Sequence, residues 1–93
     1  MLDEIAQNGD ADLIRRTAAG DREAFAAFVA KHGGAIHRFL RTVAGDSAED
    51  ALQETFLGAW RWAASFRGES SARTWLFTIA RNAARRQQRR RVA

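Results

Sequence analysis

The last 22 residues of the chain carry the clearest chemical signal in the sequence. Residues 72–93 contain seven arginines and no acidic residue, whereas residues 1–71 contain eight basic and all eleven acidic side chains. The formal charge of +4 therefore combines −3 in the first part with +7 in the second. Because arginine neutralises phosphates and releases their counterions, this segregation predicts a polyanion-binding segment on a mildly acidic body. The alternative is an arginine run that only complements a helix dipole or frays at the chain end.

If residues 72–93 are helical, their polar side chains flank an apolar stripe that runs from Trp75 to Ile79. Near one edge of the stripe lie Asn82, Arg86 and Arg89. On the other flank lie Arg73, Phe77 and Arg81. Asparagine can pair bidentately with a base edge, and aromatic side chains such as Phe66 or Trp75 can support an unstacked base. For Trp75 the alternative is a place in the core, and its position in the apolar stripe favours that alternative.

A second patterned surface lies earlier in the chain. Its side chains fall largely off the apolar stripe of their helix and combine acids, an amide and one apolar group: Glu49, Asp50, Gln53, Glu54 and Leu57. Such a strip suits a basic partner helix, although a solvated outer face would look similar. Leu57 among polar neighbours, and Trp62 off the same stripe, favour a partner, since exposed large apolar groups on a small domain often mark one.

The sequence offers no catalytic or metal-binding constellation. His32 and His37 are five residues apart and lack the i,i+4 spacing of metal ligands, which favours a solvated or boundary position for each. There is no cysteine, no phosphate-cradling glycine loop and no serine beside a plausible base. We therefore expect no cofactor, no metal and no enzymatic activity, and a function that rests on binding.

The composition predicts the elements that must position these surfaces. Hydrophobic residues make up 46% of the chain, charged residues 28%, and proline is absent, which is typical of a single all-α domain built as a small four-helix bundle. The expected helices cover residues 10–20, 21–44, 47–65 and 71–90. The first should be capped by Asp10 or Asp12, and the second should run through Gly33 and Gly34.

Two of these helices have buried stripes that the spacing predicts. In the third helix the stripe contains Leu52, Phe56, Ala59, Trp60 and Ala63. In the fourth it contains Trp75, Leu76, Ile79 and Ala83. No membrane span or signal peptide is evident, so a cytoplasmic location is expected.

Four strings occur in an order and spacing that resemble a known family. They are GDREAF (20–25), AEDALQETFLGAW (48–60), FRG (66–68) and TWLFTIARN (74–82). Together they resemble region 2 of the extracytoplasmic-function (ECF) sigma factors, in the sigma-70 family, over nearly the whole chain from Asp12 to Arg91. The resemblance implies that residues 1–93 form one region 2 domain.

The resemblance also implies partners and contact residues. Core RNA polymerase, through the clamp coiled coil of its β′ subunit, would contact Asp50, Gln53, Glu54 and Leu57. The −10 promoter element, as single-stranded DNA, would place an extruded base among Glu69, Ser70 and Ser71, with Ile79 and Asn82 lining that site. Arg85, Arg86 and Arg89 would hold the phosphate backbone. An anti-sigma factor is a further expected partner, and the setting would be the bacterial cytoplasm.

The family's second helical domain, which reads the −35 element, has no counterpart in these 93 residues. We therefore expect a fragment, or a sigma-like protein without that half. Two rival functions stay open: a non-specific helical module that binds single-stranded DNA or RNA, and a decoy that titrates an anti-sigma factor.

Overall fold

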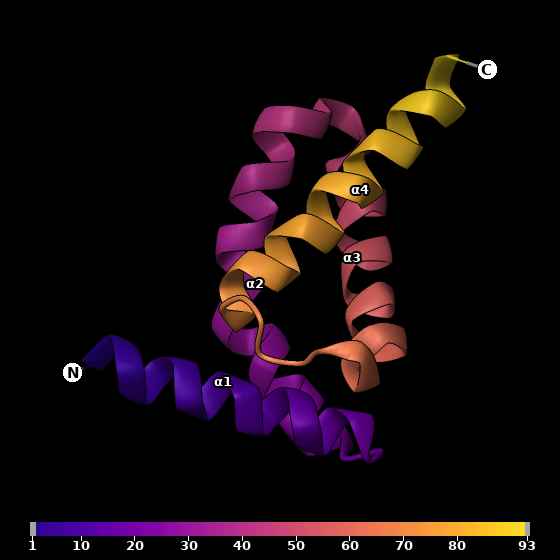
Figure 1. Cartoon of the computed structure of the whole chain (residues 1–93). Coiled ribbons are helices and arrows are strands. Elements are labelled where there is room, and N and C mark those ends of the chain that lie inside the picture. The colour runs from indigo at the N-terminus through magenta and orange to yellow at the C-terminus, as the bar shows by residue number, and fades with distance from the viewer. Residues whose placement is uncertain (1, 93) are drawn as a thin grey trace.

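The computed structural model describes residues 2–92, with side chains from Gly9 onward, and the fold of this part is all-α, as expected. Its helices are α1 (Leu2–Ala18), α2 (Arg22–Ala44), α3 (Ala48–Trp62) and α4 (Ala72–Val92). Short 3-10 turns, Gly45–Ser47 and Ala63–Ser65, continue the chain after α2 and α3. The helices α2, α3 and α4 pack on one another, and α1 crosses one end of this group (Figure 1).

The junction between α1 and α2 follows from local chemistry. Gly20 has a φ of 95°, a left-handed conformation that residues other than glycine rarely adopt, and it ends the turn after α1. Asp21 then caps α2, because its carboxylate accepts a hydrogen bond from the Ala24 backbone N–H at 3.1 Å. The second helix runs without interruption through Gly33 and Gly34, as the apolar spacing predicted.

The expected start of the first helix was wrong. The helix begins at Leu2, so Asp10 lies inside it and cannot act as its N-cap. Asp10 is instead 4% exposed, and its carboxylate lies 2.7 Å from Lys31 Nζ and 3.1 Å from His32 Nε2, both on α2. His32 is therefore buried rather than solvated. This polar cluster fixes α1 against α2, since a buried carboxylate is tolerated only with such partners.

Small side chains let α3 and α4 approach closely. The buried surfaces of these two helices consist largely of alanines: Ala48, Ala51, Ala59, Ala72, Ala80, Ala83 and Ala84. A Cβ atom added at Gly58 would lie 3.1 Å from Ile79 Cγ2, closer than an ordinary van der Waals contact. Thr55 is fully buried and satisfies its hydroxyl by donating to the Ala51 carbonyl at 2.6 Å. The few large buried side chains, Phe28, Ile36, Leu40 and Leu76, fill the space between α2 and this pair.

Trp60 departs from the stripe that the spacing predicted. It is 39% exposed and packs its edge against Phe25 of α2, with ring centroids 5.2 Å apart and an interplanar angle of 72°. The buried residues of α3 are instead Ala48, Ala51, Thr55 and Ala59, and the indole of Trp60 lies beside Phe25 of α2. None of the helices in the described part of the chain has the length and apolar character that crossing a membrane requires.

Candidate partner-binding surfaces

Three of the four residues expected to contact polymerase form a continuous exposed surface on α3. Asp50, Gln53 and Leu57 are exposed at spacings of three and four residues, and Leu57 is 65% exposed. We call these three residues the α3 strip. A helix places such residues on one face, so the carboxylate, the amide and the leucine present themselves together.

An apolar cleft continues the α3 strip toward α2. Its volume is about 640 Å³, and its lining comes from Arg22, Phe25, Gln53, Phe56, Leu57 and Trp60. The sequence pattern indicated Leu57 for this surface but placed Trp60 in the core. The helical phase alone could not separate these positions, because the tryptophan lies at the boundary between the buried and exposed faces. The surface thus combines a negative charge, an amide and an apolar cleft, which suits a partner of mixed basic and apolar character.

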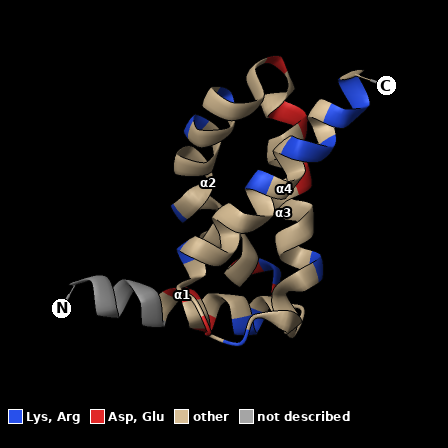
Figure 2. Cartoon of the chain, turned by 45° about the horizontal axis from the view of Figure 1, so that its top comes forward, with Lys and Arg blue, Asp and Glu red and all other residues tan. Residues whose placement is uncertain are grey.

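Glu54, the fourth expected polymerase contact, is engaged within the chain. Its side chain is 23% exposed. Arg86 Nε donates to Glu54 Oε1 at 2.7 Å, and Gln87 Nε2 donates to Oε2 at 3.3 Å. The guanidinium of Arg90 lies 3.8 Å from Oε1. Glu54 therefore fastens the C-terminal half of α4 to α3, where Figure 2 shows acidic and arginine-bearing segments side by side.

The electrostatics of this link predict a pH dependence. Burial by itself would raise the pKa of Glu54, but the hydrogen bonds from Arg86 and Gln87, and the charges of Arg86 and Arg90, outweigh it and hold the pKa below the ordinary value of 4.5. A carboxyl with a depressed folded-state pKa stabilises the fold above its unfolded pKa, and this stabilisation is lost as the pH falls through the folded value.

We therefore expect the free energy of unfolding of the parent chain to exceed that of Glu54→Gln at neutral pH, and the difference to shrink as the pH falls below 4.5. Urea unfolding of both chains, followed by circular dichroism over this range, measures the difference. A difference that stays constant over the whole pH range would show that folding does not lower the pKa of Glu54.

The loop before α4 forms a small cleft of its own. Ser65, Phe66, Arg67, Glu69, Ser70 and Trp75 line about 310 Å³. Phe66 and Trp75 pack edge to face with centroids 5.4 Å apart. Ser71 is a structural residue, because its Oγ accepts a hydrogen bond from the Thr74 backbone N–H at 3.1 Å and so caps α4. Two of the three expected loop residues, Glu69 and Ser70, thus meet at one cleft, together with aromatic side chains.

Asn82 lies in a different groove, farther along α4. The groove encloses about 760 Å³ and is lined by Asn82, Arg85, Arg86, Gln88, Arg89 and Val92. A rise of about 1.5 Å per residue puts Asn82 roughly 15 Å beyond the first residue of the helix. Ile79 is half-buried against Gly58 and lines neither site. The structure therefore separates the loop cleft from the groove that holds Asn82 and the arginines Arg85, Arg86 and Arg89.

Within the described residues, no group of three or more histidine, cysteine, aspartate or glutamate side chains is placed to hold a metal ion. The described histidines each meet one carboxylate, His32 with Asp10 and His37 with Glu49, the latter at 2.9 Å. These pairs connect α2 to α1 and to α3. The exposed surfaces of α3 and α4 are therefore the features that we consider for partner binding.

Comparison with known proteins assigns the chain to a class. The sequence model of the family Sigma-70 region 2 matches residues 28–93. The chain therefore belongs to the sigma-70 region 2 family, and its relatives place it among the ECF sigma factors.

The relatives are similar over most of this chain but are longer. The ECF RNA polymerase sigma factor SigM of Mycobacterium tuberculosis is 38% identical over 79 residues, which is 83% of this chain and 40% of SigM. The sigma-H factor of Pseudomonas aeruginosa is 38% identical over 85 residues, 87% of this chain and 43% of that protein. The ECF sigma-E factor of Haemophilus influenzae is 39% identical over 77 residues, 82% of this chain and 41% of that protein. The chain thus spans about two fifths of these curated relatives.

A solved structure shares the fold. CnrH, in a structure described as CnrH in complex with the cytosolic domain of CnrY, superposes with a TM-score of 0.74 at 33% sequence identity. The match covers 83% of this chain and 51% of CnrH. The all-α fold expected from the sequence is therefore a sigma-factor fold.

Proposed function

We propose that this chain is the part of a transcription initiation factor that binds core RNA polymerase through the α3 strip and holds the −10 promoter element as single-stranded DNA with α4. It acts by binding, in the cytoplasm of a bacterium, and not by catalysing a reaction. The observation that carries the proposal is the exposure of Asp50, Gln53 and Leu57 beside the apolar cleft, on a chain of the sigma-70 region 2 family.

The structure changes one part of the expected contact set. Glu54 is largely buried and bonded to Arg86, so we assign it first to holding α4 and only second to a polymerase contact. Arg86 already donates a hydrogen bond to Glu54. The exposed Arg85 and Arg89 are therefore the arginines on this flank that are more available to bind phosphates. Neither appears in an ion pair among the described residues, and both line the groove with Asn82.

Promoter opening then follows from differential binding. An unpaired base can be read on its exposed edges, and unstacking it costs only a few kcal/mol. Because the loop cleft and the Asn82 groove would favour the open strand over the duplex, their binding energy shifts the equilibrium toward melted DNA without nucleotide hydrolysis. We place the extruded base at the loop cleft with Glu69 and Ser70, while Ser71 caps α4, and the following nucleotides along α4, where Asn82 reaches a base edge.

The decisive experiment on the whole proposal is the capture of core RNA polymerase by the immobilised 93-residue chain. Retention of the polymerase supports the assignment. A chain that retains none at concentrations where a full ECF sigma factor does so would refute it. This result also separates the proposal from a non-specific single-strand binder, which needs only the arginines of α4.

Asn82→Ala is expected to reduce the preference of the chain for a single-stranded −10 oligonucleotide over a scrambled one by about tenfold, since a bidentate base contact contributes roughly 1–3 kcal/mol of discrimination. Fluorescence anisotropy titrations of both oligonucleotides measure the preference. Gln88→Ala is the matched control, because Gln88 lies in the same groove but donates its amide to the Val43 carbonyl at 2.8 Å. An undiminished preference in Asn82→Ala would remove Asn82 from the DNA contacts.

A protein counterpart of the kind seen with CnrH is a second candidate partner. CnrH is described in complex with the cytosolic domain of CnrY. We propose that an anti-sigma factor likewise binds this chain, and that a decoy role would follow if the chain bound such a protein but showed no preference for −10 DNA.

A further inference from the structure

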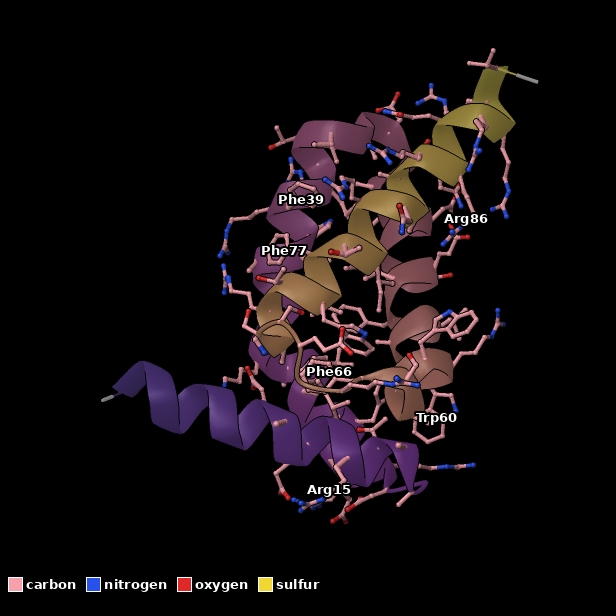
Figure 3. The ribbon with its side chains drawn as sticks, viewed as in Figure 1. Arg15, Phe39, Trp60, Phe66, Phe77 and Arg86 are labelled. Carbon is pink, nitrogen blue, oxygen red and sulfur yellow. The ribbon has the colours of Figure 1, made fainter. Side chains whose placement is uncertain are left out.

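A second cleft lies on the flank of α4 that faces away from Asn82. It encloses about 630 Å³ between α2 and α4 and is lined by Phe39, Arg73, Thr74, Phe77, Thr78 and Arg81. We call it the α2–α4 cleft. In Figure 3, Phe39 and Phe77 lie on one side of α4 and Arg86 on the other. At about 100° per residue, Asn82 is turned roughly 140° from Phe77, so one helix presents two separate faces.

The charge of the α2–α4 cleft is uncompensated. Arg73 and Arg81 are exposed, and neither belongs to an ion pair in the described part of the chain. No acidic side chain lines the cleft. The contrast with Arg86 is direct, because that arginine is neutralised by Glu54. The cleft therefore presents two free positive charges on the helix that also carries the Asn82 groove.

The floor of the cleft is aromatic and ordered. Phe39 and Phe77 pack edge to face, with centroids 5.2 Å apart and an interplanar angle of 69°. The Arg73 guanidinium carbon lies 5.1 Å from the Phe77 ring centroid, a cation–π contact that holds the arginine at the cleft. Arg81 is eight residues farther along, about 12 Å at the helical rise. Two cations at this separation, on either side of two half-buried aromatic rings and two threonines, match a chain of phosphates joined by sugars better than a single anion.

We infer that the α2–α4 cleft holds the sugar–phosphate backbone of a second DNA strand while the Asn82 groove holds the first. The inference rests on the proposed function, because it assigns α4 a place between two strands that have separated. Positive charge on both faces of one helix favours the open state over the duplex, since only separated strands reach both faces together. Arg73 and Arg81 bind phosphates, and Phe39 and Phe77 contact the sugars or bases between them.

The test compares two probes and two charge-matched variants of the 93-residue chain. The probes are a single-stranded −10 oligonucleotide, and a duplex in which the same segment is held open by mismatches. The variants are Arg73→Gln/Arg81→Gln and the control Arg41→Gln/Arg61→Gln, which removes two exposed arginines from α2 and α3. Affinities are measured by anisotropy over a range of salt concentrations, and circular dichroism checks that each variant is folded.

We expect Arg73→Gln/Arg81→Gln to flatten the salt dependence of mismatched-duplex binding by about 1.4 in the slope of log K against log salt, at roughly 0.7 per phosphate contact to a single strand. The same variant should leave binding of the single-stranded oligonucleotide unchanged. The control should not lower the slope for the mismatched duplex more than the slope for the single strand. This pattern holds even if Asn82→Ala leaves the sequence preference intact, so failure of base reading and failure of the second-strand site are distinguishable.

Several outcomes overturn the inference. One is a mismatched-duplex slope equal to that of the control variant. Another is an equal loss on both probes, which would mean that Arg73 and Arg81 serve the first strand. A third is measured with a glutamate-rich peptide as an additional probe: if Arg73→Gln/Arg81→Gln binds the mismatched duplex normally but loses affinity for the peptide, the cleft belongs to an acidic protein. A parent chain that binds the mismatched duplex no better than the single strand also refutes it.

Discussion

Replacing Asp50, Gln53 and Leu57 together by alanine is expected to lower the affinity of the chain for core RNA polymerase by about a hundredfold. Truncation of a contact residue at the centre of an interface commonly costs 1 kcal/mol or more, and about 3 kcal/mol in total corresponds to roughly this factor. The three side chains are exposed, so their loss should leave the fold intact. Leu57 should account for the largest share, because it is 65% exposed and borders the apolar cleft.

The measurement is a competition assay in which the variant displaces a labelled parent chain from core polymerase. Glu23→Ala/Val92→Ala is a suitable control, since it removes one exposed acid and one exposed apolar side chain outside the α3 strip. Equal competition by the triple variant and this control would show that the polymerase binds elsewhere. Unchanged single-stranded DNA binding by the triple variant would confirm that the two surfaces act separately.

Glu54 requires a separate comparison because it belongs to both surfaces. Its carboxylate is bonded to Arg86 in the described structure, so removing it alters the attachment of α4 as well as the charge of α3. A loss of polymerase affinity in a Glu54 variant would therefore not locate a direct contact. Variants of the exposed Asp50 and Gln53 therefore test the polymerase contact more directly. Helical spacing alone could not distinguish these two residues from Glu54.

Local signals in the sequence were sufficient to predict helix α2 and the capped start of helix α4. Asp21 after Gly20, and Ser71 before an apolar-periodic run, each cap a helix by accepting a backbone hydrogen bond. The apolar spacing through Gly33 and Gly34 was strong enough to outweigh the low helix propensity of glycine. These elements depend on interactions between residues that are near in sequence, which a single chain displays directly.

The features that sequence patterns did not predict depend on contacts between residues far apart in the chain. Asp10 looked like a helix cap because aspartate favours that position, yet its partners, Lys31 and His32, lie on the next helix. The helical spacing predicted that Glu54 is an exposed acid. In the structure α4 places Arg86, 32 residues away in sequence, beside it. Pairings of this kind are fixed by how the helices pack, and the helix-by-helix pattern of one sequence does not contain them.

Leu76→Ala is expected to lower the free energy of unfolding by about 3 kcal/mol, within the range typical of large-to-small substitutions at fully buried leucines. Leu76 is 0% exposed and belongs to a core in which most members are alanines. The substitution leaves a cavity, and a core with few large side chains has little capacity to relax into it. For a domain of this size, such a loss corresponds to a fall in Tm of roughly 15 °C.

Leu57→Ala supplies the matched control for this prediction, because the same chemical change at an exposed site should shift stability by less than about 0.5 kcal/mol. Urea unfolding followed by circular dichroism gives both values. Similar losses for the two variants would mean that α4 is not anchored through Leu76. Since α4 carries both the Asn82 groove and the α2–α4 cleft, we also expect Leu76→Ala to weaken binding at both faces at temperatures where Leu57→Ala leaves DNA binding unchanged.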